Sequence, residues 1–201
     1  MLALKKWNPL ENSQLTSFHE YYNKCDPEIK FEIDEIADKI IPEGYARVKA
    51  MDELYITAKD ASGSDLVFET PHIDGPFGFL PFKLLRCVYA VFGSDAIETC
   101  FKDGDNIVLK DNEHLMFDYN RDVHYIRKIG DMDNDRIVIK LHFVRKQLLY
   151  RVFALLNIIW NSSARFIFNN SKDPQTIGES ILAFIINTTT HYYPKLFKKF
   201  I

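Results

Sequence analysis

The chain has 201 residues, of which 47% are hydrophobic and 26% are charged, and this balance is typical of a globular protein. A net charge of −3 provides no basic field, so the composition excludes a nucleic-acid-binding protein of the usual basic kind. Aromatic residues make up 14%, which favours β-structure or a large apolar pocket over a helical bundle. The three cysteines, an odd number without close pairs, argue against a disulfide scaffold and for a reducing compartment.

The first 43 residues are predicted to form an N-terminal helical region. Between residues 29 and 41, isoleucines and Phe31 combine alternation with helical spacing among acidic residues, and Pro42-Glu43-Gly44 ends this run. The apolar part of the N-terminus is too short for a secretory signal peptide. Together with the reduced cysteines, this predicts a cytoplasmic location.

Residues 44–145 are predicted to form the core domain from many short strands separated by turn residues. The strand-like segments are 45–50, 54–58, 65–69, 86–92, 97–101, 107–109, 115–117 and 136–144. Short strands at such near-regular spacing indicate a β-sandwich or a barrel.

Residues 146–201 are predicted to form a C-terminal helical extension. The segments 147–160 and 175–186 are apolar without strand alternation, and neither reaches the roughly 20 residues that a membrane span needs. On a helix, Leu148, Val152, Leu155 and Ile159 share one apolar face. We expect the first helix to pack on the core or to pair with the second, and peripheral membrane contact is the less favoured alternative.

The segment from Thr70 to Gly78 contains the first two candidate metal ligands. His72 and Asp74 are two residues apart just beyond a strand-like run, so their side chains are expected on the same side. The following Gly75-Pro76 turns the chain away at once. His124, at the end of a later strand-like segment, is the third candidate. Two histidines and one carboxylate form the facial triad of non-haem Fe(II) oxygenases, which leaves coordination positions open.

Two arginines are candidates for binding an anionic cosubstrate. Arg136 opens the last strand, and its guanidinium is suited to hold the free carboxylate of 2-oxoglutarate in a bidentate contact. Arg86 opens the central apolar strand, where it either contacts the cosubstrate or forms a structural ion pair. His142 shares a strand face with Arg136 and is expected to be partly buried, whereas His114 is expected to face solvent.

His72-Ile73-Asp74, His124 and Arg136, in this order, resemble the Fe(II)/2-oxoglutarate-dependent dioxygenases. Within that superfamily, residues 112–124 and 135–142 are similar to the aspartyl/asparaginyl β-hydroxylase branch. That branch has a Phe-Asp-rich run before its second iron histidine, followed by an Arg-led apolar strand that ends in His. The resemblance spans about residues 68–143. The chain departs from the branch in having Asp74, because these enzymes often lack the acidic ligand, and in having Phe143 where Pro usually follows the terminal His.

The resemblance implies a mainly β fold, a double-stranded β-helix (jelly roll) with flanking helices. It implies catalytic roles for His72, Asp74 and His124 as Fe(II) ligands and for Arg136, with Arg86 as a second cosubstrate contact. The reaction implied is hydroxylation of an unactivated C–H bond with O₂ and 2-oxoglutarate, with an Asp or Asn side chain of a protein as one target. The apolar C-terminal region would suit a lipid or acyl substrate, and another small molecule is a further alternative. The alternatives are a non-catalytic jelly-roll metal-binding or structural module, and a cupin-like enzyme that uses another metal without 2-oxoglutarate.

Overall fold

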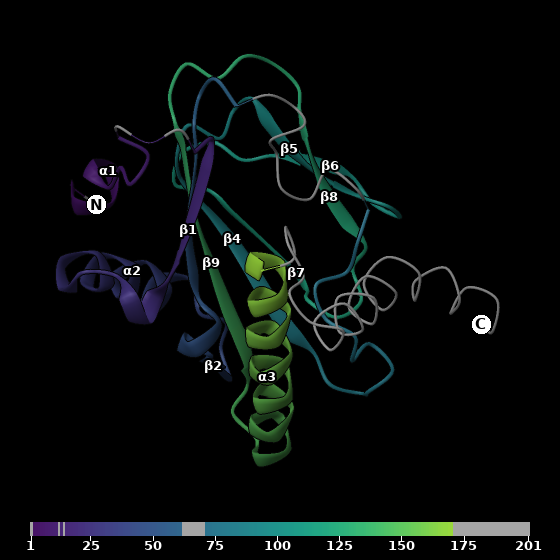
Figure 1. Cartoon of the computed structure of the whole chain (residues 1–201). Coiled ribbons are helices and arrows are strands. Elements are labelled where there is room, and N and C mark those ends of the chain that lie inside the picture. Colours follow the sequence, from purple (N-terminus) through teal and green to yellow (C-terminus); the bar gives the residue numbers. More distant parts are fainter. Residues whose placement is uncertain (1, 12, 14, 62–70, 171–201) are drawn as a thin grey trace.

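The computed structural model describes residues 2–11, 13, 15–61 and 71–170, with side chains up to residue 163. The predicted strand 65–69 and the predicted helix 175–186 lie outside the described residues. The described part is mainly antiparallel β-structure in two sheets with flanking helices, as Figure 1 shows. This confirms the predicted jelly-roll type of fold.

The larger sheet has six strands, and its order is β1-β3-β9-β4-β7 with β2 added beside β9. Its strands are β1 (Ser17–Tyr21), β2 (Tyr45–Arg47), β3 (Glu53–Thr57), β4 (Leu84–Phe92), β7 (His114–Asp118) and β9 (Arg136–Arg145). The smaller sheet has the order β6-β5-β8. Its strands are β5 (Ile97–Phe101), β6 (Asn106–Val108) and β8 (His124–Lys128).

Strands β4 and β9 form the centre of the larger sheet, because they are nearly continuous apolar runs that are buried on both faces. Their register places Arg86 opposite His142 and Val88 opposite Lys140. On β9 the odd-numbered residues from Ile137 to Phe143 pack into the largest hydrophobic core. The even-numbered residues therefore face the other side of the sheet, where the candidate site lies.

The N-terminal region covers one face of the larger sheet. It contains α1 (Leu2–Lys6), the 3₁₀ helix η1 (Tyr22–Lys24) and α2 (Pro27–Ile40). A second 3₁₀ helix, η2 (Lys49–Met51), follows β2. Helix α2 buries Ile29, Ile33 and Ile36 against the same core as β9. The region is not only helical, because β1 pairs with β3 and thereby extends the larger sheet.

The C-terminal helix α3 (Leu148–Asn170) begins where the sequence predicts a helix. The face that packs is different from the apolar face that the spacing suggests. Leu148, Val152, Leu155 and Ile159 are each at least half exposed. The buried positions are Phe153, Ala154, Asn157 and Asn161. The reason is that Phe153 inserts between the aromatic rings of Phe77 and Phe82, which lie in the loop before β4.

None of the described helices combines the length and the apolar character that crossing a bilayer requires. All three cysteines are free and buried, as their sequence pattern predicts.

Candidate metal centre

The backbones of His72 and His124 are hydrogen-bonded neighbours. The two residues form an isolated antiparallel bridge, in which each amide N–H donates to the carbonyl of the other over 3.0 Å. Because directly opposite residues in such a bridge point to the same side, the two imidazole rings lie side by side with centroids 4.7 Å apart. The smaller sheet thus brings together two ligands that are far apart in sequence.

His124 begins strand β8, so the expectation that it ends a strand was wrong. The preceding residues form a turn around Asp118. The Asp118 side chain accepts from the backbone N–H of Asn120, and its carbonyl accepts from the N–H groups of Arg121 and Asp122. An aspartate that binds its own backbone two residues on favours a turn over a strand. The Phe-Asp-rich run is therefore strand β7 and the turn that leads from it into the metal ligand.

Asp74 is placed by a close approach between two loops. The N–H of Gly75 donates to the Tyr119 carbonyl over 3.1 Å, and the N–H of Phe77 donates to Asn120 Oδ1. A Cβ at Gly75 would lie 2.3 Å from Asn120 Oδ1, so only glycine fits there. Helix α3 adds a further contact, because Trp160 Nε1–H donates to the carbonyl of Asp74 over 3.2 Å. The turn after the ligand is thus fixed on both sides.

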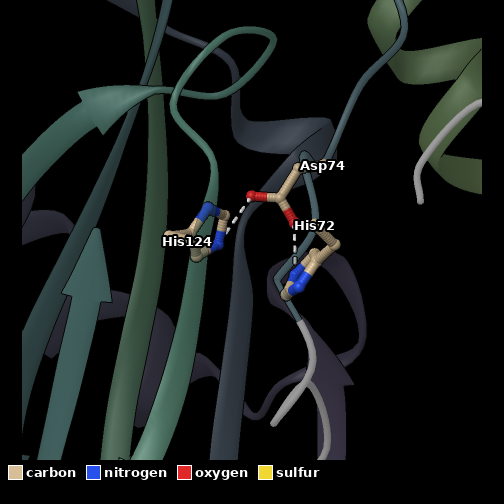
Figure 2. A group of neighbouring side chains, drawn as sticks. All are labelled: His72, Asp74 and His124. Carbon is tan, nitrogen blue, oxygen red and sulfur yellow. Dashed lines mark ion pairs between the residues drawn. The ribbon is translucent and has the colours of Figure 1, made fainter. Parts of the chain in front are cut away.

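His72, Asp74 and His124, called the metal triad below, converge on one point (Figure 2). Asp74 Oδ2 lies 3.4 Å from His124 Nε2, Asp74 Oδ1 lies 3.8 Å from His72 Nε2, and the three ligand atoms lie within 4.8 Å of one another. Ligand atoms bound at about 2.1 Å and at right angles would be about 3 Å apart. The spacing is therefore suited to one divalent ion.

The environments of Asp74 and His124 favour metal-binding protonation states. Asp74 Oδ2 is buried and has no hydrogen-bond partner within the described structure, which is costly unless a ligand satisfies it. Burial would raise the pKa of Asp74, but the charges of Arg86, His124 and His72 outweigh burial and hold that pKa well below its usual range. Burial lowers the pKa of His124. The carbonyl of Asp122, 3.0 Å from His124 Nδ1, leaves Nε2 as the metal-binding nitrogen.

Arg86 forms the structural ion pair that was one of its two predicted roles. Its Nη1 lies 2.8 Å from Asp74 Oδ1, and its guanidinium carbon lies 4.6 Å from the centroid of the Tyr119 ring. A cosubstrate contact stays a prediction, because Arg86 also lines the cavity described next. His114 is exposed as predicted. His142 is more buried than predicted, since its side chain has no exposed surface.

A cavity of about 60 Å³ opens beside the metal triad, between the two sheets. Both Arg86 and Arg136 line it, and much of its wall is apolar. The apolar lining side chains are Val88, Phe117, Ile126 and Val138. Lys140 also lines the cavity, with its Nζ 4.0 Å from the centroid of the Tyr55 ring. One water position needs about 10–15 Å³, so the volume of this cavity is enough for a small ligand.

Arg136 contributes a buried positive charge to this cavity. Its Nε–H donates to Ser94 Oγ over 3.2 Å, and none of the carboxylates in the described ranges pairs with it. Burial lowers the pKa of Arg136 to about 10, so the guanidinium is still charged at neutral pH. A buried charge without a counter-charge is unfavourable unless an anion is bound beside it. The sequence prediction of an anion-binding arginine is consistent with this environment.

Lys140 and Tyr55 are among the cavity-lining residues that were not predicted from the sequence. Lys140 follows Arg136 by four residues on β9, so the two-residue period of the strand would have placed both on one face. Tyr55 lies on β3, and no local signal connects it with the metal triad. Its position follows only from the pairing of β3 with β9, in which Tyr55 is opposite Val138.

No protein-family model and no curated protein matches the chain. Among solved structures, KdgF from Halomonas sp. is 18% identical, covers 53% of this chain and 85% of its own, and has a TM-score of 0.32. A 2OG-Fe(II) oxygenase family oxidoreductase from Burkholderia pseudomallei is 15% identical, with coverage of 54% and 50% and a TM-score of 0.36. The non-haem alpha-ketoglutarate-dependent epimerase SnoN from nogalamycin biosynthesis is 11% identical, with coverage of 72% and 84% and a TM-score of 0.33. Likenesses this distant do not assign an activity.

Proposed function

We propose that the protein is an Fe(II)- and 2-oxoglutarate-dependent oxygenase that hydroxylates an unactivated C–H bond. One observation supports this most strongly. A single cavity between the sheets is lined both by the metal triad and by the buried guanidinium of Arg136, which has no carboxylate partner in the described part. A divalent ion would satisfy the ligand atoms of the metal triad, and the carboxylate of a bound small molecule would neutralise the guanidinium of Arg136.

The metal triad would hold Fe(II) through two neutral imidazoles and one ionised carboxylate. Three protein ligands leave about three positions of a six-coordinate ion open, as in the facial-triad oxygenases. Fe(II) with 2-oxoglutarate and O₂ supplies the oxidising power for C–H hydroxylation. The chain's own contribution is to fix the three ligand atoms and to keep the cavity wall apolar beside them.

Arg136 would bind the carboxylate of 2-oxoglutarate that is remote from the metal. A guanidinium offers two parallel N–H donors to a carboxylate, and burial makes this contact stronger than it would be in water. Lys140 is a second basic side chain in the lining of the same cavity. The proposed targets are an Asp or Asn side chain of a protein, a lipid or acyl group, or another small molecule.

The test is anaerobic addition of Fe(II) and 2-oxoglutarate to the purified full chain. We expect a metal-to-ligand charge-transfer band in the visible region, because the cosubstrate chelates the iron. Arg136→Met should weaken the band at the same cosubstrate concentration and leave iron bound. Arg145→Met is the matched control, since Arg145 is the exposed residue at the other end of β9.

The possible results separate the competing functions. Bound iron without a charge-transfer band or 2-oxoglutarate binding would replace the proposal by a cupin-like enzyme with other chemistry. A chain that binds no divalent metal would leave the non-catalytic structural module as the better reading.

A further inference from the structure

The carboxylate of Asp74 is divided between two partners. Oδ1 lies 2.8 Å from Nη1 of Arg86, in a charge-assisted pair with side chains that are 9% and 4% exposed. Oδ2 faces Nε2 of His124 and has no hydrogen-bond partner among the described residues. One oxygen is therefore occupied before any metal arrives, and the other is available.

Arg86 is itself held from the side away from Asp74. Its Nε–H donates to Nε2 of His142 over 3.1 Å. Asp52 Oδ1 accepts from the backbone N–H of His142 over 2.8 Å and lies 3.2 Å from Nδ1 of the same residue. Because a carboxylate can only accept here, Nδ1 carries the proton and Nε2 is the acceptor that Arg86 needs. Both Asp52 and His142 are fully buried, so this arrangement is shielded from water.

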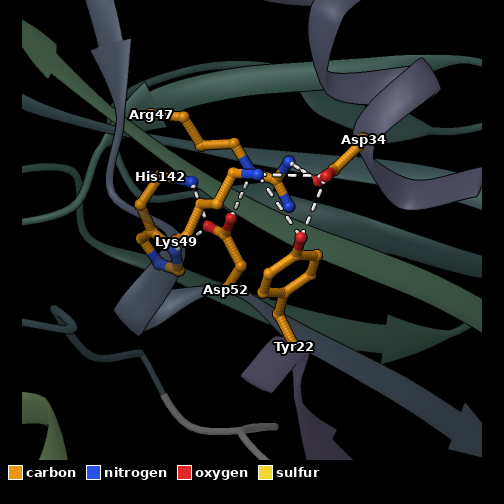
Figure 3. A network of polar contacts seen from close by, with 6 residues as sticks. All are labelled: Tyr22, Asp34, Arg47, Lys49, Asp52 and His142. Carbon is orange, nitrogen blue, oxygen red and sulfur yellow. Dashed lines mark hydrogen bonds and ion pairs between the residues drawn. The ribbon is translucent and has the colours of Figure 1, made fainter. Parts of the chain in front are cut away.

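The series continues from Asp52 through Arg47 and Asp34 to Lys49, whose side chain is half exposed (Figure 3). Asp52 Oδ2 accepts from Arg47, whose Nη1 pairs with Asp34. Asp34 Oδ2 in turn lies 3.0 Å from Lys49 Nζ and 3.0 Å from the Tyr22 hydroxyl. These groups come from η1, α2, β2 and η2, and none of them lines the cavity. Arg86 is thereby anchored to rigid elements that do not belong to the metal centre.

We propose that Arg86, held by His142 and Asp52, is a positioning residue that restricts Asp74 to one-oxygen coordination of the metal. This inference rests on the proposed function, because it concerns the same metal. Two histidines and one carboxylate oxygen leave about three positions on a six-coordinate ion, whereas a carboxylate that binds through both oxygens leaves about two. A chelating cosubstrate takes two positions, so only the first arrangement keeps one for O₂.

The direct measurement uses Mn(II) as the probe and counts the water molecules bound to it by water-proton relaxation. The wild-type protein should show about three inner-sphere waters, and Arg86→Met about two, since Oδ1 is then free to bind the ion. Mn(II) affinity should stay the same or rise, because a positive charge next to the site is removed. 2-Oxoglutarate affinity should fall about tenfold or more. A purely structural role would instead weaken both affinities together and leave the water number unchanged.

A matched pair of variants at His142 tests the positioning without altering a cavity residue. His142→Gln places an amide oxygen near the position of Nε2 and keeps the acceptor for Arg86. His142→Asn places its amide nitrogen near Nδ1, where it can still donate to Asp52 but offers Arg86 no acceptor. We expect the Gln variant to resemble wild type in water number and 2-oxoglutarate affinity, and the Asn variant to resemble Arg86→Met. Equal behaviour of the two variants, or the reverse order, would overturn the inference.

The failure of this inference can be distinguished from the failure of the proposed function. Wild-type protein that does not bind Mn(II) refutes the metal centre, and the positioning role with it. The positioning role alone is refuted if the wild-type protein binds Mn(II) and 2-oxoglutarate and all three variants keep the wild-type water number.

Discussion

Replacement of Arg136 by Met should make the protein more stable when no cosubstrate is present. The guanidinium is buried, and desolvation alone lowers its pKa from its usual high range to about 10. A fall of that size corresponds to about 3 kcal/mol of unfavourable free energy for the charged form in the folded state. The hydrogen bond to Ser94 offsets about 1 kcal/mol of this. The net gain expected from Arg136→Met is therefore between about 1 and 3 kcal/mol in free energy of unfolding.

The pH dependence of this stability difference follows from the direction of the pKa shift of Arg136. A cation with a lowered pKa in the folded state destabilises that state wherever both states are protonated. The penalty is complete below pH of about 10 and is relieved only as pH rises above it. The difference between wild type and variant should therefore be constant across neutral pH.

The assay is urea unfolding of the two proteins with Mn(II), with and without 2-oxoglutarate. Saturation at 100 times Kd should stabilise the wild type by about 2.7 kcal/mol and leave the variant unchanged. The stability advantage of the variant is thus expected to disappear or reverse when the cosubstrate is added. If Arg136→Met is less stable than wild type without cosubstrate, while Arg145→Met is unaffected, then the guanidinium already has an anionic partner in the protein and the reasoning is refuted.

Four further predictions concern the metal triad, its support and the packing of α3. Alanine at any residue of the metal triad should reduce iron occupancy measured by elemental analysis, since two ligands hold a labile ion poorly; unchanged content in all three variants would contradict the site. Burial lowers the pKa of His124 below 6.5, so protons should compete only weakly with Mn(II) for this ligand. Mn(II) affinity should therefore stay level from pH 7 to 6.5, and a steep loss of affinity there would count against a neutral His124. Gly75→Ala should lower Mn(II) affinity about tenfold, because the new Cβ displaces the turn after Asp74. The far-UV circular dichroism spectrum should stay unchanged. Equal affinity would mean that the two loops move apart without displacing Asp74. Phe153→Ala should lower the free energy of unfolding by about 3–5 kcal/mol in urea, whereas the exposed Val152→Ala should change it by less than about 0.5 kcal/mol.

The sequence by itself determined the features that depend on neighbouring residues. Alternation and turn residues located most of the described strands, since each strand needs only its own side-chain pattern and the breakers at its ends. His72 and Asp74 were identified together because a two-residue spacing and an immediate Gly-Pro turn constrain both side chains locally. Arg136 was identified as the start of the last strand.

The tertiary structure alone decided which distant groups meet. The bridge between His72 and His124, the pairing of Arg86 with Asp74, and the support of His142 by Asp52 all depend on strand register, and a shift of one residue would turn each side chain to the other face. The packing face of α3 was decided in the same way. Its apolar stripe suggested one face, but the aromatic loop before β4 accepts Phe153 and so buries another. Periodicity shows that a helix has an apolar side, whereas the partner that covers a side is set by the shape of surfaces that only folding brings together.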